Sequence, residues 1–126
     1  MPTIVLKRLV MNGLEVGKMD QQMIDATDFI LERLESLGHA ELASRLTLTC
    51  APAHVEPQNV NDLPVTIIDV FDECALTQEV REETYKFYPA AKLAHLKTGG
   101  NFPYLSRSDE VNLYLSIHLR NFESAI

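Results

Sequence analysis

The sequence has few cysteines, no cluster of lysine and arginine, and no apolar run long enough to cross a membrane. Its two cysteines, Cys50 and Cys74, belong to no C-x-x-C motif and to no Cys/His ligand spacing, which indicates reduced thiols in an intracellular protein. The net charge of -7, from 18 acidic and 11 basic residues, argues against a nucleic-acid or anionic-membrane partner. Residues 1–10 carry Lys7 and Arg8 inside a short apolar run, so we expect neither a signal peptide nor an integral membrane segment.

A nucleophile elbow and a metal-ligand pattern are also missing. No serine has glycines two positions before and after it, so the G-x-S-x-G motif of serine hydrolases does not occur. The histidines pair with no cysteine or carboxylate at a spacing that metals use, and we expect no metal and no cofactor. They are His39, His54, His95 and His118. His95 falls inside an expected strand, and we interpret it as a packed structural residue.

The first part of the chain, residues 1–50, is predicted to be a block of helices. Apolar residues recur at helical spacing most clearly in the middle of this block, where Asp20 can cap the start of a helix and Gly38 can take the left-handed conformation after its end. The expected helices span residues 4–11, 20–37 and 40–48, and the first of them is expected to end at Asn12-Gly13.

Residues 64–126 are predicted to form a β-α-β-α unit, after a connecting loop over residues 49–63. The run 64–70 is short and β-branched, which is typical of a strand buried on both faces of a parallel sheet. A helix (77–88), a second strand (92–96), a Gly-Gly loop and an amphipathic helix (108–122) are expected to follow. The helix over residues 77–88 is expected to have Thr77 as its cap and to face inward with Val80, Thr84 and Phe87 or Tyr88. The helix over residues 108–122 has an apolar stripe of Val111, Leu115, Leu119 and Phe122. This order predicts a right-handed parallel crossover.

Two parallel strands do not form a stable sheet by themselves, because both faces and both edges need cover. In a chain of 126 residues we expect that cover to come from another copy, through self-association, or from strands outside this segment. We favour the second alternative. Residues 1–126 are then one partial domain, the carboxyl-terminal part of a larger α/β fold.

Three stretches of sequence carry a resemblance to a known family. They are residues 28–48, residues 64–72 and above all Ala-His-Leu-Lys-Thr-Gly-Gly-Asn-Phe-Pro-Tyr-Leu at 94–105, followed by 107–108 and 110–114. The order of elements resembles the last third of an α/β-hydrolase, with residues 1–50 in the place of the lid helices, and within that superfamily it is similar to the maspardin family. The resemblance implies a cytoplasmic protein, peripheral to endosome or Golgi membranes. It also implies binding to the cytoplasmic tail of a T-cell co-receptor, a part in endosomal trafficking, and negative regulation of T-cell activation.

The same resemblance identifies the positions of a degenerate catalytic triad. The catalytic histidine of an α/β-hydrolase would stand in the loop after the second strand, where this chain has Asn101. An amide cannot take up a proton near neutral pH as an imidazole can. The triad acid would be Asp72, or Glu73 if the loop is one residue longer. Without an imidazole to orient, the carboxylate has no triad role, so we expect the chain not to be an enzyme.

The Gly-Gly loop is instead expected to bind a protein partner. Gly99 and Gly100 lack the spacing of a phosphate-binding loop, so we interpret them as a sharp turn that needs positive φ. Phe102 and Tyr104 flank a proline and can form a firm ledge for a partner.

Two other functions of the chain remain as alternatives to protein binding. The first is a serine hydrolase fragment whose nucleophile lies upstream, and the second, ranked last, is a stand-alone helical interaction module.

Overall fold

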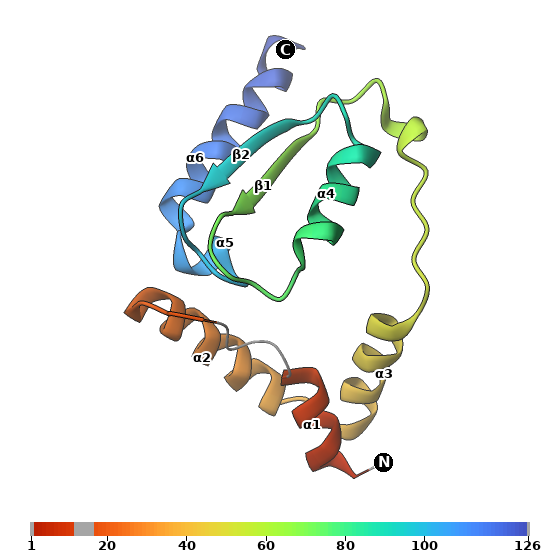
Figure 1. Cartoon of the computed structure of the whole chain (residues 1–126), viewed down its shortest axis with the longest axis vertical. Coiled ribbons are helices and arrows are strands. Elements are labelled where there is room, and N and C mark those ends of the chain that lie inside the picture. The colour runs from red at the N-terminus through yellow and green to blue at the C-terminus, as the bar shows by residue number, and fades with distance from the viewer. Residues whose placement is uncertain (1, 12–16, 126) are drawn as a thin grey trace.

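The computed structural model describes residues 2–11 and 17–125. It is a mixed α/β arrangement with one parallel strand pair, as predicted (Figure 1). The elements are α1 (Thr3–Met11), α2 (Gln21–Glu35), α3 (His39–Cys50), β1 (Thr66–Val70), α4 (Gln78–Phe87), β2 (Lys92–Leu96), α5 (Pro103–Ser106) and α6 (Ser108–Leu119), with 3₁₀ turns at Pro57–Val60 and Arg120–Ala125.

The helices α1, α2 and α3 form a block at one end of the molecule (Figure 1). α1 packs on α3 and touches α2. The buried leucines of the block are Leu6, Leu34 and Leu42. The expected cap of α2 is confirmed, because the Asp20 carboxylate accepts a hydrogen bond from the Met23 N–H at 2.9 Å. The expected stop of α1 at Asn12-Gly13 lies outside the described residues.

The connection between α2 and α3 differs from the prediction for Gly38. This glycine has a φ of -76° and an extended conformation, so the expected left-handed position is wrong. Ser36 is the C-cap of α2 and adopts a helical conformation. Gly38 is the N-cap of α3, and its carbonyl accepts a hydrogen bond from the Leu42 N–H at 3.1 Å. Because the next helix begins at once, the backbone must be extended at this position.

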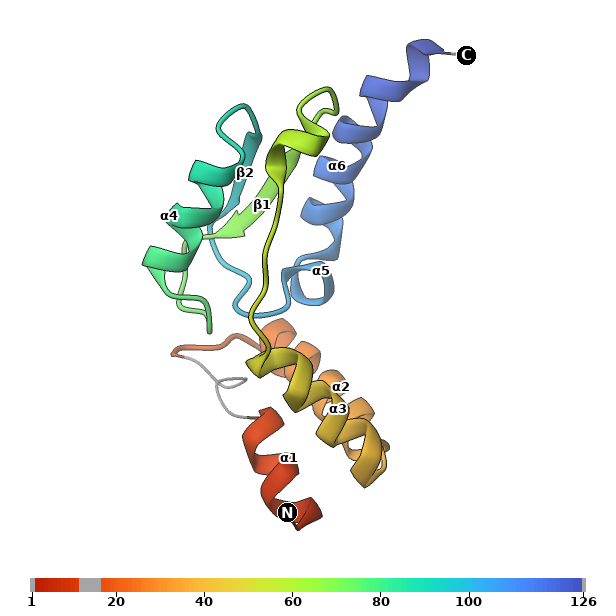
Figure 2. The ribbon, with the colours of Figure 1, turned by 90° about the vertical axis from the view of Figure 1, so that its right-hand side faces the viewer.

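The two strands pair in parallel, with Asp69 of β1 opposite His95 of β2. α4 connects them and starts at Thr77, whose side chain caps the helix as expected. α4 lies on one face of the strand pair and α6 on the other (Figure 2). Within the described part of the chain, the sheet consists of these two strands. The expected burial of β1 on both faces is wrong here: Val70 is buried, but residues 66–69 are only half-buried, because the outer edges are open.

Helix α4 turns a different side to the sheet than the sequence predicted. Of the residues expected to face inward, Val80 and Phe87 are exposed, whereas Thr84 and Tyr88 are half-buried. Arg81 and Tyr85 reach the strands instead, and both form hydrogen bonds with Asp69. The bonds to the charged Asp69 therefore bring a polar side of the helix to the strand, and Val80 and Phe87 are left toward solvent.

Helix α6 keeps several apolar side chains exposed. Of its predicted stripe, Val111 is half-buried, whereas Leu115, Leu119 and Phe122 are exposed. The helix also ends earlier than predicted, at Leu119, and Phe122 belongs to the 3₁₀ turn that follows. Exposed apolar side chains gathered on one element mark a surface that is covered in an assembly or by further chain.

We predict that the isolated chain self-associates in dilute solution, because the open strand edges and the apolar side of α6 favour contact with another copy. Sedimentation velocity should show species larger than the monomer. Replacing Leu115 and Leu119 together by Gln should shift the distribution toward the monomer. Leu48→Gln, which changes an exposed leucine on α3, is the control and should leave it unchanged. A monodisperse monomer with a sharp cooperative melt and no dye-accessible apolar surface would contradict the prediction.

Candidate functional site

The loops that follow β1 and β2 meet at the carboxyl end of the strand pair. The Asp72 carboxylate accepts hydrogen bonds from the N–H groups of Gly99 and Gly100, at 3.0 Å and 3.1 Å. Asn101 makes a second link, because its Oδ1 accepts a hydrogen bond from the Ala75 N–H at 2.6 Å. The two positions predicted for a triad acid and a triad base therefore lie on adjacent loops, and each binds the backbone of the opposite loop.

Glu73, the alternative acid, takes a different direction. Its carboxylate lies against the backbone of Gly17, at the place that a Cβ on that glycine would occupy. Glu73 is exposed, whereas Asp72 is half-buried and faces the Gly-Gly loop. Of the two acids that the sequence left open, Asp72 is the one that contacts this loop.

The Gly-Gly turn is buried and contacts the helical block. Gly100 has a φ of +65°, which confirms the predicted positive φ, and a side chain here would be strained. A Cβ on Gly100 would also lie 2.8 Å from the Met23 Cε of α2. Since Gly99 and Gly100 are both buried, these two predicted binding residues position the loop through their backbone and do not present a surface.

The two aromatic residues after the turn differ in exposure. Phe102 is half-buried, while Tyr104 keeps 55% of its surface exposed. Their rings meet edge to face, with centroids 6.3 Å apart and an interplanar angle of 81°. The buried hydroxyl of Ser106, at the end of α5, donates to the Gly99 carbonyl at 2.8 Å and holds the segment down. Of the four predicted binding residues, Tyr104 has the exposed side chain, and Phe102 is only partly accessible to a partner.

Arg107 joins the end of α5 to the start of α2, a contact that sequence reasoning missed. Its guanidinium forms an ion pair with Asp20 and donates to Gln22 Oε1 at 3.2 Å and to Thr98 Oγ1 at 2.9 Å. Hydrogen bonds from the Met23 N–H and from Arg107 hold the pKa of Asp20 below its ordinary value. Arg107 and Asp20 lie 87 positions apart, so no local pattern could have revealed the pair.

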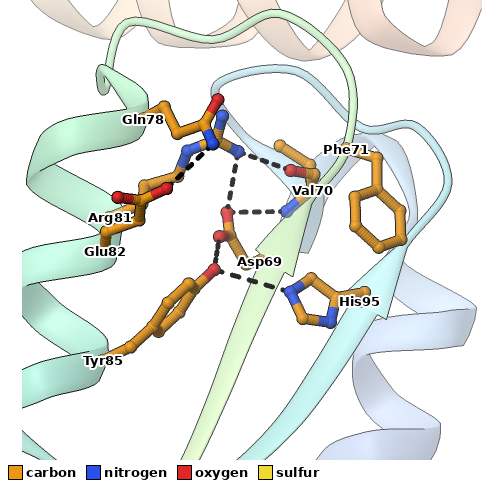
Figure 3. A pocket seen from close by; sticks show the side chains of 8 residues that line it. All are labelled: Asp69, Val70, Phe71, Gln78, Arg81, Glu82, Tyr85 and His95. Atoms are coloured by element: carbon orange, nitrogen blue, oxygen red, sulfur yellow. Dashed lines mark hydrogen bonds and ion pairs between the residues drawn. The ribbon is translucent and has the colours of Figure 1, made fainter.

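A second candidate site is a polar pocket of about 250 Å³ between α4 and the strands (Figure 3). Asp69 lies at its centre. The Asp69 carboxylate accepts hydrogen bonds from the Val70 N–H at 2.8 Å and from the Tyr85 hydroxyl, and it pairs with Arg81 Nη1 at 3.4 Å. Arg81 Nη1 also donates to the Val70 carbonyl at 2.7 Å. These bonds fasten α4 to β1.

His95 packs at the open side of this pocket, in agreement with its interpretation as a packed residue. Its ring stacks on Phe71 with centroids 4.6 Å apart, and its Nε2 lies 3.5 Å from the Tyr85 hydroxyl. Sequence reasoning missed the other members of the cluster. The available signals were Asp69, a charged residue inside a β-branched strand, and Arg81 and Tyr85, which lie one helical turn apart.

The electrostatics of Asp69 and Tyr85 do not favour acid–base chemistry by these two groups near neutral pH. Partial burial by itself raises the pKa of Asp69, but the hydrogen bonds from Tyr85 and Val70 and the charge of Arg81 outweigh it, so the pKa lies below its ordinary value. Burial and the hydrogen bond to Asp69 raise the pKa of Tyr85 to about 12. At neutral pH the carboxylate is charged and the phenol keeps its proton. Neither group titrates in the range that a general acid or base needs.

Residues 2–11 and 17–125 contain neither a metal-binding cluster nor a helix suited to a membrane. No group of three or more His, Cys, Asp or Glu side chains is placed so that it could hold a metal ion. No helix in these ranges combines the length and the apolar character that crossing a membrane requires.

The described residues thus define an α/β segment in which a carboxylate and an amide join the two loops after a parallel strand pair. Over 122 residues the chain is 59% identical to maspardin from Danio rerio, from Homo sapiens and from Mus musculus. The match covers 97% of this chain and 39% to 40% of those proteins, and it lies in their carboxyl-terminal part. The predicted resemblance to maspardin is thereby confirmed over nearly the whole chain.

The chain spans about 40% of the length of the curated relatives that it matches. The name of these relatives states no catalytic activity. No protein-family model matches the chain, and no solved structure matches it either.

We predict that Tyr85→Phe lowers the free energy of unfolding by about 1.5–3 kcal/mol at neutral pH, because a hydrogen bond to a charged carboxylate is lost. Urea unfolding followed by far-UV circular dichroism measures this. Tyr88→Phe, at the residue that directly follows α4, is the matched control, since the Tyr88 hydroxyl makes no hydrogen bond within the described residues. It should change the free energy by less than about 0.5 kcal/mol.

The pH dependence of the Tyr85→Phe effect follows from the two pKa shifts. The pKa of Asp69 is lowered in the folded state, so its contribution is complete above the ordinary value of 3.8 and is lost as the pH falls through the folded pKa. The pKa of Tyr85 is raised, so its contribution is complete below 10.0 and is lost as the pH rises toward about 12. The difference in the free energy of unfolding between Tyr85→Phe and the unchanged chain should therefore shrink at low pH and at high pH. A difference that is constant with pH would argue against a hydrogen bond between Tyr85 and Asp69.

Proposed function

We propose that this chain is the carboxyl-terminal part of a non-catalytic α/β-hydrolase-like protein that acts by binding another protein. In this proposal β1, α4, β2 and α6 are the end of the hydrolase sheet with its covering helices, and α1, α2 and α3 form a lid-type block. The observation that carries the proposal is Asn101. It stands in the loop after β2, where a hydrolase needs an imidazole, and its side-chain oxygen accepts a hydrogen bond from the Ala75 N–H.

The hydrogen bonds of Asp72 support the same proposal. In a working triad, the carboxylate accepts a hydrogen bond from the imidazole that it orients. Here the Asp72 carboxylate accepts from the N–H groups of Gly99 and Gly100. A carboxylate used in this way holds two loops together instead of orienting a base.

The partner in this proposal is a protein. The ground for choosing a protein partner is the similarity of the chain to maspardin. We infer that the partner is the cytoplasmic tail of a T-cell co-receptor, and that binding takes place in the cytoplasm, at the surface of endosomes or Golgi membranes, and regulates T-cell activation negatively. The proposed binding face is the loop 99–105 with the adjoining end of α6. Tyr104 is its accessible aromatic residue, and tyrosine is among the residues that most often anchor protein interfaces.

We predict that the purified chain hydrolyses short-chain p-nitrophenyl esters no faster than a denatured sample. Triad members act as a unit, so a carboxylate without its nucleophile and base contributes little. Asn101→His should be equally inactive, because the chain has no serine elbow for an imidazole to activate. Saturable turnover that disappears in Asp72→Ala would contradict the prediction and favour a serine hydrolase fragment.

We predict that Tyr104→Ala weakens binding of a labelled co-receptor tail peptide by about 30-fold, equivalent to about 2 kcal/mol, with the melting temperature nearly unchanged. Phe102→Ala should weaken binding and also lower the melting temperature, because Phe102 is half-buried. Fluorescence anisotropy and thermal melts followed by circular dichroism measure the two quantities, and Leu48→Ala on α3 is the control. If Tyr104→Ala lowers the melting temperature strongly while the folded fraction binds as before, the residue serves packing and the interface lies elsewhere.

A further inference from the structure

The junction between the helical block and the strand pair has an open hollow with an apolar floor. α2 packs on α5 there, as the two elements lie next to each other in Figure 1. Phe29 of α2 and Leu105 of α5 line the hollow and keep 44% and 36% of their surface exposed. Its volume is about 270 Å³, and Gln22, Asp25 and Ala26 complete the lining.

A second hollow continues the first one toward the start of α6. It has a volume of about 150 Å³ and shares Gln22 and Leu105 with the first. Its far side carries Asp109 and Glu110, in the first turn of α6. We call the two hollows together the α2–α5 groove, lined by Gln22, Asp25, Phe29, Leu105, Asp109 and Glu110.

The α2–α5 groove has an excess of negative charge. Asp25, Asp109 and Glu110 form no ion pair with any described residue. Arg107 also borders the groove, but its side chain is only 11% exposed and its charge is paired with Asp20. One further cation, Arg33, lies over the Phe29 ring at 5.0 Å from the centroid. Even when the positive charge of Arg33 is included, the three carboxylates give the groove a net negative charge.

We propose that the α2–α5 groove binds a basic amphipathic segment of a partner protein. An apolar side chain of that segment lies between Phe29 and Leu105, and its lysine or arginine side chains lie against Asp25, Asp109 and Glu110. The inference rests on the proposed protein-binding function and adds the chemistry of the partner and the extension of the binding face from Tyr104 onto α2. Charge complementarity of this kind sets partner choice and the rate of association.

Other occupants fit the α2–α5 groove less well. In a two-fold symmetric contact between copies the same surface meets itself, which would place this acidic surface against the same acidic surface of the second copy. The carboxylates also repel an anionic lipid surface. Each hollow is smaller than the roughly 300–1,000 Å³ of a small-molecule pocket, and a single side chain is a better match for that size.

The inference is tested with a fluorescein-labelled amphipathic helical peptide of leucine and lysine, bound to the full chain and measured by anisotropy at low and at high salt. A leucine/glutamate peptide and a serine/lysine peptide of equal length are the comparison probes. The leucine/lysine peptide should bind most tightly, and its affinity should fall with salt. Phe29→Ser should raise its Kd about tenfold or more, because the apolar anchor loses its contact. Equal binding of all three peptides would overturn the proposal.

A charge-matched pair of triple variants separates the groove from the general acidity of the chain. One variant carries Asp25→Asn, Asp109→Asn and Glu110→Gln. The other carries Glu79→Gln, Glu82→Gln and Glu83→Gln, which removes as many charges from exposed positions of α4. The first should raise the Kd about tenfold and flatten its salt dependence, while the second should change the Kd less than about twofold. Equal effects of the two variants would overturn the proposal, because the attraction would then not be local.

Two outcomes distinguish this inference from the proposed function. If Tyr104→Ala weakens capture of the co-receptor tail while the leucine/lysine peptide does not bind, the protein-binding function stands and the basic-segment inference is wrong. If Phe29→Ser changes only the sedimentation coefficient of the chain and no peptide binds, the groove is an interface between copies, and the inference is also wrong. Melts followed by circular dichroism confirm that each variant is folded before it is scored.

Discussion

The hydrogen bonds from the N–H groups of Gly99 and Gly100 to the Asp72 carboxylate are the contact on which the rest of the arrangement depends. They hold the loop after β2 against the loop after β1. The loop after β2 brings Gly100 next to Met23 and leads directly into α5, which packs on α2. The helical block and the strand pair therefore meet at one junction. A charged acceptor gives hydrogen bonds about twice as strong as a neutral one, which suits a contact that joins two parts of the chain.

The elements of this fold could be predicted wherever the determinants are local. α2 and α4 each start at a capping side chain, Asp20 and Thr77, and the structure has both caps. The side of α4 that faces the strands could not be predicted, because Asp69 selects it through bonds that apolar periodicity does not reveal. The conformation of Gly38 depends on where the next helix begins, which the end of α2 does not determine. Propensity thus located the helices, and tertiary contacts decided how they pack.

The candidate site was predictable in position and not in its contacts. The resemblance assigned Asp72 and Asn101 to triad positions, and because parallel strands end at the same edge of a sheet, the two residues lie on neighbouring loops in the structure. Their partners are backbone N–H groups, which carry no sequence signal. Asp69 lies on β1, and its carboxylate likewise accepts hydrogen bonds from within the chain, from Val70, Arg81 and Tyr85. Asp72, which the resemblance assigned to a triad position, accepts hydrogen bonds that join two loops, and Asp69 accepts hydrogen bonds that hold α4 on the strand.

The close approach of Gly100 to Met23 makes the identity of each residue depend on the other. Met23 is buried and its terminal methyl group occupies the space that a Cβ at position 100 would need. A homologue that replaces the glycine must therefore turn or shorten the side chain at position 23, or move α2 away from the loop, besides accommodating the positive φ. In an alignment of homologues, positions 23 and 100 should therefore change together wherever the helical block stays in contact with the turn.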